Sequence, residues 1–146
     1  MYRGLIIVFN SFENEALKDF FVASINAIAD VEICLVCNSS SDKDFEILTE
    51  IAEQCNNANV VNTKRKKSNT SSVRAGARFM QNKFNLKHLG FIVGLDDLKI
   101  LEVLKDYMQH QETIVSLIKV EKENKVVKSA FLKNLFSVQE YLEKIA

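Results

Sequence analysis

The chain alternates short apolar runs with longer stretches in which apolar residues recur periodically. Residues 5–9 are apolar throughout, and Leu17, Phe21 and Ile25 follow at helical spacing. An apolar run without alternation is typical of a strand covered on both faces, and a three-to-four-residue repeat is typical of a helix packed on one side. The beginning of the chain therefore predicts a buried strand followed by a helix.

The same strand-then-helix pattern returns three more times. Predicted strands cover Val31–Cys37, 59–62 and 89–95. The helical stripes that follow them consist of Phe45, Leu48, Ile51, Ala52 and Cys55, then Val73, Ala77, Met80 and Phe84, and then Leu101, Leu104 and Met108. Repeated strand–helix units connect through right-handed crossovers, so we expect an α/β protein with a mainly parallel, Rossmann-like sheet in a three-layer α/β/α sandwich.

The last third of the chain departs from this rhythm. Residues 114–120 and 125–130 are strand-like and flank the charged turn 121–124, which predicts an antiparallel hairpin at the C-terminal end. The final helix is predicted from a face that carries Phe131, Leu135, Val138, Leu142 and Ile145. At 146 residues, residues 1–146 are expected to form a single domain.

Charge and cysteine content narrow the class of protein. The 19 basic and 19 acidic residues cancel, so no net field favours nucleic acid, and we expect no nucleic-acid partner. No apolar stretch reaches the ~18 residues of a membrane span, and the N-terminus has no signal-peptide pattern. Three cysteines, an odd number, favour reduced thiols and a cytoplasmic location. The oligomeric state stays open.

Polar residues gather where the predicted strands end. Asn10 follows the first strand, residues 38–41 follow the second, the basic loop 63–70 follows the third, and Asp96 and Asp97 follow the fourth. Ligands of parallel sheets bind outside the carboxyl ends of the strands, near the point where strand order reverses. The sequence therefore predicts a binding site along this edge.

Each of these polar groups also has a purely structural explanation. Asn10 or Ser11 can cap the first helix, and Ser41 can cap the second with Asp44 as the acidic residue of a capping box. The loop residues 38–41 can satisfy their own backbone, and residues 64–67 can be solvated. The adjacent carboxylates at 96 and 97 can cap a helix or bind Mg²⁺ or Mn²⁺.

Several other chemistries are excluded or disfavoured. Cys34 and Cys37 spell C-x-x-C, but three residues apart on a strand they face opposite sides of the sheet, which does not suit a redox pair. His88 and His110 have no partner at metal-ligand spacing. No glycine-rich phosphate loop is present, which excludes a P-loop NTPase and a dinucleotide-binding Rossmann domain. Gly76, inside a predicted helix, indicates close helix–sheet contact.

Four segments resemble the nucleotide-binding half of family 2 glycosyltransferases, which have the GT-A fold. Residues 8–15 (VFNSFENE) stand where that family has a strand ending in Tyr-Asn and a Glu-bearing helix start. Residues 36–42 (VCNSSSD) are similar to its Val-Asp-Asp/Asn-Gly-Ser-Thr-Asp step. The basic run 64–67 with residues 74–76 (RAG) matches its basic loop and Asn-x-Gly helix start, and residues 91–97 (FIVGLDD) look like a variant of its metal-binding Asp-x-Asp.

The resemblance implies a domain that binds a nucleoside-diphosphate sugar and transfers the glycosyl group by direct displacement. The residues it assigns to the nucleotide sugar are Phe9, Asn10, Asn38, Ser39, Lys67 and Arg74, and those it assigns to a Mg²⁺ or Mn²⁺ ion are Asp96 and Asp97. The chain departs from the family pattern at Cys37, which replaces a carboxylate, at Ser39, which replaces a glycine, and at Arg74, which replaces an asparagine.

Two alternatives stay open beside an active transferase. The Asp-x-Asp spacing is not intact and most of the acceptor-binding region is missing, which favours a catalytically inactive member that serves as a binding or assembly module in polysaccharide biosynthesis. A flavodoxin-like or receiver-like regulatory domain is the third possibility. A receiver needs acidic residues after the first strand, and Phe9-Asn10 does not supply them.

Overall fold

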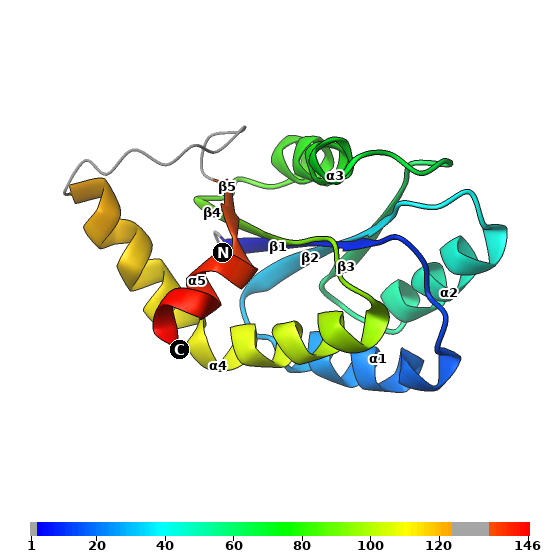
Figure 1. Cartoon of the computed structure of the whole chain (residues 1–146), viewed down its shortest axis with the longest axis horizontal. Helices are drawn as coiled ribbons and strands as arrows, with labels where there is room; N and C mark the ends of the chain where they lie inside the picture. The colour runs from blue at the N-terminus through cyan, green and yellow to red at the C-terminus, as the bar shows by residue number, and fades with distance from the viewer. Residues whose placement is uncertain (1–2, 124–134) are drawn as a thin grey trace.

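The protein is built around a five-stranded parallel sheet (Figure 1). A computed structural model describes residues 3–123 and 135–146. The strands are β1 (Arg3–Phe9), β2 (Val31–Cys37), β3 (Ala58–Asn62), β4 (His88–Ile92) and β5 (Leu135–Ser137), in the spatial order β3-β2-β1-β4-β5. The helices are η1 (Glu15–Leu17), α1 (Lys18–Ala27), α2 (Asp42–Glu53), α3 (Asn69–Lys83), α4 (Asp97–Glu123) and α5 (Val138–Ile145).

Strand side chains alternate between two hydrophobic clusters, one on each face of the sheet. From β1, Leu5, Ile7 and Phe9 pack with residues of α1, α2, α4 and α5, whereas Ile6 and Val8 pack with residues of α3. Figure 1 shows α3 on one side of the sheet and α1 and α4 on the other. Burial on both faces explains why β1 and β2 read as continuous apolar runs, and it confirms the α/β class.

Helix α3 lies unusually close to the sheet at Gly76. A methyl group at this position would approach the Cγ2 atoms of Ile6 and Val36 to 2.8 and 2.9 Å. Both neighbours are β-branched strand residues with little rotameric freedom. The close helix–sheet contact predicted from this glycine is confirmed.

The C-terminal third differs from the prediction. Helix α4 runs for 27 residues to Glu123 and includes residues 114–120, so the strand predicted there is wrong. The segment contains β-branched residues but no Gly, Pro or Asn that would end a helix, and Ile114 and Val115 bury their side chains. The partner strand predicted at 125–130 lies outside the described residues.

The fifth strand is parallel and not part of a hairpin. Leu135 of β5 aligns with Leu89 of β4, and the two strands run in the same direction. Among the residues that the structure describes, the predicted antiparallel addition is therefore absent. Leu135 belongs to this strand rather than to the final helix, and Ser137 caps α5 by accepting a hydrogen bond from the Glu140 N–H. Phe131 lies outside the described ranges.

The strand order bears on the alternatives from the sequence. In the order β3-β2-β1-β4-β5, strands β2 and β3 are added on one side of β1, and β4 and β5 are then added on the other side of β1. Flavodoxin-like and receiver-like domains have the order 2-1-3-4-5, so that alternative is wrong. Within residues 3–123 and 135–146, no helix combines the length and apolarity needed to cross a membrane.

Candidate functional site

The reversal of strand order places the candidate site between β1 and β4. These two strands are neighbours in the sheet, with Ile7 aligned to Ile92, and their carboxyl ends emerge side by side. In parallel sheets of this type, ligands bind in the crevice where the order reverses. The loop after β1, the loop after β4 and the starts of the following helices therefore define the candidate site.

Asn38 is the centre of the hydrogen-bond network at this edge. Its side chain is fully buried, and its Nδ2 donates to Asn10 Oδ1 at 2.8 Å and to the Lys67 carbonyl at 3.0 Å. Its Oδ1 accepts from the Lys67 N–H at 2.9 Å and from Thr63 Oγ1 at 3.3 Å. The structure thus brings three predicted site residues together.

The Asn38 Nδ2 thus uses both of its hydrogens and its Oδ1 accepts from Lys67, whereas the single proton of the Thr63 hydroxyl has a nearer acceptor in the Arg65 carbonyl, at 2.7 Å. Its backbone N–H is also paired, with the carbonyl of Phe9 at 2.8 Å. Asn38 therefore positions the loops after β1, β2 and β3 rather than offering a free group to a ribose.

The ring of Phe9 lies in the core. It is 1% exposed and packs against the rings of Phe12 and Phe21 at centroid distances of 5.7 and 5.5 Å. Only the backbone of Phe9 takes part in the network at the strand ends. The Phe9 ring therefore lies outside the candidate site.

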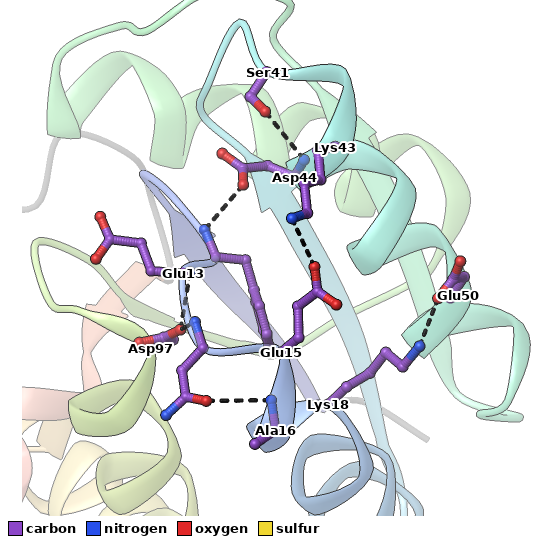
Figure 2. Close-up of polar contacts among 11 residues, drawn as sticks. Glu13, Glu15, Ala16, Lys18, Ser41, Lys43, Asp44, Glu50 and Asp97 are labelled. Carbon is purple, nitrogen blue, oxygen red and sulfur yellow. Dashed lines mark hydrogen bonds and ion pairs between the residues drawn. The ribbon is translucent and has the colours of Figure 1, made fainter.

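Ser39 and Asp44 join the start of α2 to the loop after β1. The Ser39 hydroxyl donates to Asp44 Oδ2 at 2.9 Å. Asp44 Oδ1 accepts from the Phe12 N–H at 3.2 Å (Figure 2). Ser41 caps α2 as predicted, with its Oγ accepting from the Asp44 N–H. The predicted capping box is wrong in its second half, because the Asp44 carboxylate reaches Phe12 and Ser39 instead of the Ser41 N–H, which donates to Ser39.

Asp97, at the start of α4, also accepts hydrogen bonds from the loop after β1. It is 8% exposed, and its Oδ2 accepts from the N–H groups of Glu13 at 3.1 Å and Asn14 at 2.8 Å (Figure 2). Asn14, rather than Asn10 or Ser11, caps the helical turn that follows, since its side chain accepts from Ala16.

Three successive amides of the loop after β1 therefore donate to carboxylates of the protein itself. The Phe12 N–H donates to Asp44, and those of Glu13 and Asn14 donate to Asp97. In many nucleotide-binding α/β folds, amides at this position bind a phosphate. Here the position already holds two internal anions, a feature that sequence reasoning missed because it pairs residues more than 30 positions apart.

Asp96 differs from its neighbour in being exposed. Its Oδ1 accepts from the Lys99 N–H at 2.9 Å, and its carbonyl accepts from the Ile100 N–H, so it caps α4 as predicted. Over residues 3–123 and 135–146, no three His, Cys, Asp or Glu side chains gather in a group that could hold a metal ion. The metal-binding role of Asp96 and Asp97 stays a prediction.

Lys67 lies two residues before α3 and Arg74 lies in the second turn of this helix, and both side chains are exposed. Ser68 caps this helix by accepting from the Ser71 N–H at 3.1 Å, and its first turn holds no acidic residue. The loop after β4 comes close to the same point, because a methyl group at Gly94 would lie 3.4 Å from Asn69 Nδ2. Gly94 has a φ of +80°, a conformation that glycine adopts without strain.

The cysteines are packed in the core. Cys34 joins the cluster under α3, whereas Cys37 joins the cluster on the opposite face, so the predicted separation is confirmed. Burial raises the pKa of the Cys34 thiol to about 12 and that of Cys37 to about 11. Neither thiol is activated as a nucleophile.

The edge of the sheet thus combines an ordered polar network with an exposed basic loop. The residues it brings together are Asn10, Asn38, Ser39 and Lys67, with Asp97 joined to the same loop after β1. Comparisons with protein-family models, with curated proteins and with solved structures found no match.

Proposed function

We propose that this protein binds a nucleoside-diphosphate sugar at the carboxyl edge of its sheet. The diphosphate lies against the start of α3, where Lys67 and Arg74 supply positive charge and the helix supplies the positive end of its dipole. The nucleoside lies over the polar loops that carry Asn10 and Ser39. The GT-A-like, three-layer form of the fold belongs to this proposal.

The Asn38 network is the observation that carries the proposal. It fixes the backbone of Lys67 beside Asn10 through two hydrogen bonds to one buried amide. The basic residues 64–67 are therefore attached to an ordered point of the sheet edge, and they precede a helix whose first turn has no acidic residue. A preorganised loop loses less conformational entropy when it binds an anion.

A divalent ion, Mg²⁺ or Mn²⁺, would bind at Asp96 in this arrangement. Asp96 is exposed, whereas the Asp97 carboxylate is buried and already accepts two loop amides. The ion would neutralise charge on the diphosphate. Glycosyl transfer additionally requires a base on the acceptor side, which the described residues do not identify.

A binding or assembly module without catalysis is the second candidate. It is favoured by the use of Asp44 and Asp97 as internal anions, since these carboxylates stabilise the loop after β1 and are not free for a substrate. This candidate predicts the same nucleotide binding as the first but no turnover.

Thermal unfolding with UDP, GDP, CDP and their sugars, each with and without Mn²⁺, tests the proposal. A ligand at about 100 times its Kd adds ~2.7 kcal/mol to the stability of the native state, which for a domain of this size raises Tm by about 5–10 °C. We expect one nucleotide series to produce this shift, with a larger shift in Mn²⁺. The absence of a shift with every nucleotide at millimolar concentration would reject the proposal.

Four variants locate the binding site if a nucleotide raises Tm. Lys67→Ala and Arg74→Ala should each reduce this rise, whereas Lys99→Ala on the exposed surface of α4 should not. Asp96→Asn keeps an N-cap side chain and removes the negative charge, so it should abolish the additional effect of Mn²⁺ while the nucleotide still binds. Hydrolysis or transfer assays with the stabilising sugar nucleotide then separate an enzyme from a module.

A further inference from the structure

The neutral net charge of the chain conceals a strong separation of charge. Residues 54–95 contain eight Lys and Arg and no Asp or Glu. Because the whole chain has 19 residues of each sign, the other 104 residues carry 11 basic and 19 acidic side chains. The segment from β3 to β4 therefore carries eight positive charges, and the rest of the protein carries an equal negative excess.

The fold places α3, which carries three of these basic residues, on one face of the sheet. Helix α3 covers its face of the sheet, and the helices on the opposite face, α1, α2 and α4, contain acidic residues (Figure 1). The basic residues of the segment are all exposed, and they are Lys64, Arg65, Lys66, Lys67, Arg74, Arg78, Lys83 and Lys87. On the α3 side of the sheet, Glu32 is a half-buried acidic residue at the amino end of β2.

The outward side of α3 is polar as well as basic. Val73, Ala77 and Met80 face the sheet, so Arg74 and Arg78, one helical turn apart, lie on the outer side together with Ser71. The helix of 15 residues is ~22 Å long, and basic residues precede it, follow it and lie along it. The result is an elongated positive surface, which we call the α3 face.

Positive charge continues from the α3 face around the amino ends of the strands. Burial and the nearby charges of Lys122, Arg3, Lys119 and Lys87 lower the pKa of His88 at the start of β4. Arg3 is partly compensated, because its Nη1 lies 2.7 Å from Glu112 Oε1. Basic side chains of β1 and α4 therefore lie near the amino end of β4, as Lys87 does.

We propose that the α3 face binds the phosphate backbone of a nucleic acid without reading its sequence. Lys and Arg side chains, hydroxyl and amide side chains, and helix N-termini are the groups that contact phosphates in such complexes, and α3 with its preceding loop offers all of them. The field that matters for such binding is local, since charges beyond about 8 Å are largely screened at physiological salt. A neutral net charge is therefore compatible with a nucleic-acid partner.

A nucleic acid fits this surface better than a membrane does. Stable attachment to a membrane combines basic residues with an inserted apolar group or a lipid anchor. The large hydrophobic side chains that are exposed within residues 3–123 and 135–146, Phe20, Leu98 and Val120, belong to α1 and α4 rather than to the α3 face. The serine, threonine, asparagine and glutamine side chains on and before α3 instead suit hydrogen bonds to phosphate.

Fluorescence anisotropy with a labelled 20-base-pair DNA and a labelled 20-nucleotide RNA tests the proposal over 50–200 mM KCl. We expect binding in the range typical of sequence-independent contacts, with Kd of about 10⁻⁴–10⁻⁶ M at physiological salt, and a linear fall of log K with log salt. The double variant Lys66→Ala/Arg78→Ala should weaken binding about ten-fold and reduce the magnitude of the salt slope by about 2. Alanine is favourable in the helix at position 78, so folding is retained.

The matched control is Lys99→Ala/Lys105→Ala, which removes the same charge from α4 on the opposite face and should leave binding unchanged. Vesicles that contain phosphatidylserine are the competing probe. Equal loss in both double variants, no binding of either nucleic acid at 50 mM KCl, or binding of vesicles alone would overturn the proposal.

This inference and the proposed nucleotide site can be separated. Lys66→Ala/Arg78→Ala leaves Lys67 and Arg74 in place, so any stabilisation by a sugar nucleotide should persist in this variant. Because Lys67 and Arg74 belong to both surfaces, millimolar UDP should weaken the binding of labelled DNA only in part, and Lys66→Ala/Arg78→Ala should still weaken it about ten-fold in the presence of UDP. Complete displacement of the DNA by UDP would show that the nucleic acid occupies the nucleotide site and would overturn a separate α3 face.

Discussion

Two buried or half-buried carboxylates organise the loop between β1 and α1. Asp44 and Asp97 come from the first turns of different helices, and each accepts backbone N–H groups of the same loop. Such charge-assisted hydrogen bonds are stronger than neutral ones, and they also place negative charge near helix N-termini. The loop conformation is therefore fixed by side chains that are distant in the sequence.

Replacement of Asp97 should reveal how much this organisation contributes. Asp97→Ala leaves the amides of Glu13 and Asn14 without an acceptor, and we expect the free energy of unfolding to fall by about 2 kcal/mol. Urea denaturation at pH 7 measures the change. Asp97→Asn keeps an oxygen acceptor and should lose less.

Asp96→Ala is the matched control for that experiment. It removes a helix cap but no contact to the loop after β1, so it should lose about 1 kcal/mol. Equal losses in Asp96→Ala and Asp97→Ala would mean that the loop amides are satisfied by water once Asp97 is removed.

The Asn38 side chain joins the far end of the segment between β3 and α3 to the sheet, while Thr63 at its beginning also donates to the Cys37 carbonyl. Thr63 and Lys67 both hydrogen-bond to the Asn38 amide, and the residues between them are basic and exposed. Lys64 adopts a φ of +66°, which a non-glycine residue keeps only when its surroundings favour it.

Removal of the Asn38 amide should release this segment. In Asn38→Ala, the backbone groups of Lys67 lose their partner, so we expect trypsin to cut within residues 64–67 at least ten times faster than in the unchanged protein, because cleavage follows the population of the open segment. Mass spectrometry locates the cut. Asn10→Ala removes one bond to the same amide but not the bonds to Lys67, so it should accelerate cleavage much less; equal acceleration would contradict the assigned role.

Local sequence patterns correctly predict those elements whose burial and ends are determined by residues close together in the chain. The apolar runs of β1 and β2 and the serine cap of α2 depend on residues close in the chain, and these features can be read directly. The strand predicted at residues 114–120 is wrong because β-branched residues favour strands in general, while packing against the core decides the outcome here. β5 is a three-residue strand, too short to give a periodic signal.

The candidate site was predictable in position but not in detail. Polar residues at strand ends indicate the edge because parallel strands share a direction. Tertiary contacts decide which of these polar groups form hydrogen bonds within the protein. Asn38 pairs with Lys67, and Asp97 pairs with Asn14 across 83 positions. No local pattern encodes such a pair, and for the same reason the separation of charge between α3 and the opposite face emerges only from the fold.

Topology explains why both proposals draw on the same segment. The crossover from β3 to β4 carries α3 to the face of the sheet opposite α1 and α2, and it starts at the carboxyl edge. One acid-free stretch thus contributes Lys67 to the edge and Arg78 to the outer surface. A ligand at the edge and a polyanion on the α3 face would repel each other electrostatically only within a Debye length, about 8 Å at physiological salt.

The molecule as a whole should lose stability at alkaline pH. Burial raises the pKa of Cys34 from 9.0 to about 12, that of Cys37 to about 11, and that of Tyr107 from 10.0 to about 12. The pKa of Tyr141 is also raised, by burial and by its hydrogen bond to Glu121. The unfolded chain releases these protons first, so stability is fully present below about pH 9 and falls as the pH rises toward the folded-state values.

Urea denaturation at pH 8, 9.5 and 10.5 measures this loss, and the thiols can be separated by substitution. Each group that stays protonated only in the folded state contributes up to about 1.4 kcal/mol per pH unit. Cys34→Ala creates a small cavity and lowers stability at every pH, so the informative quantity is the slope, which should become shallower. Cys55→Ala, at a less buried thiol, should flatten the slope less. A slope that does not change in Cys34→Ala would mean that this thiol ionises as readily in the folded protein as in the unfolded chain, which its complete burial between β1 and β3 under α3 does not allow.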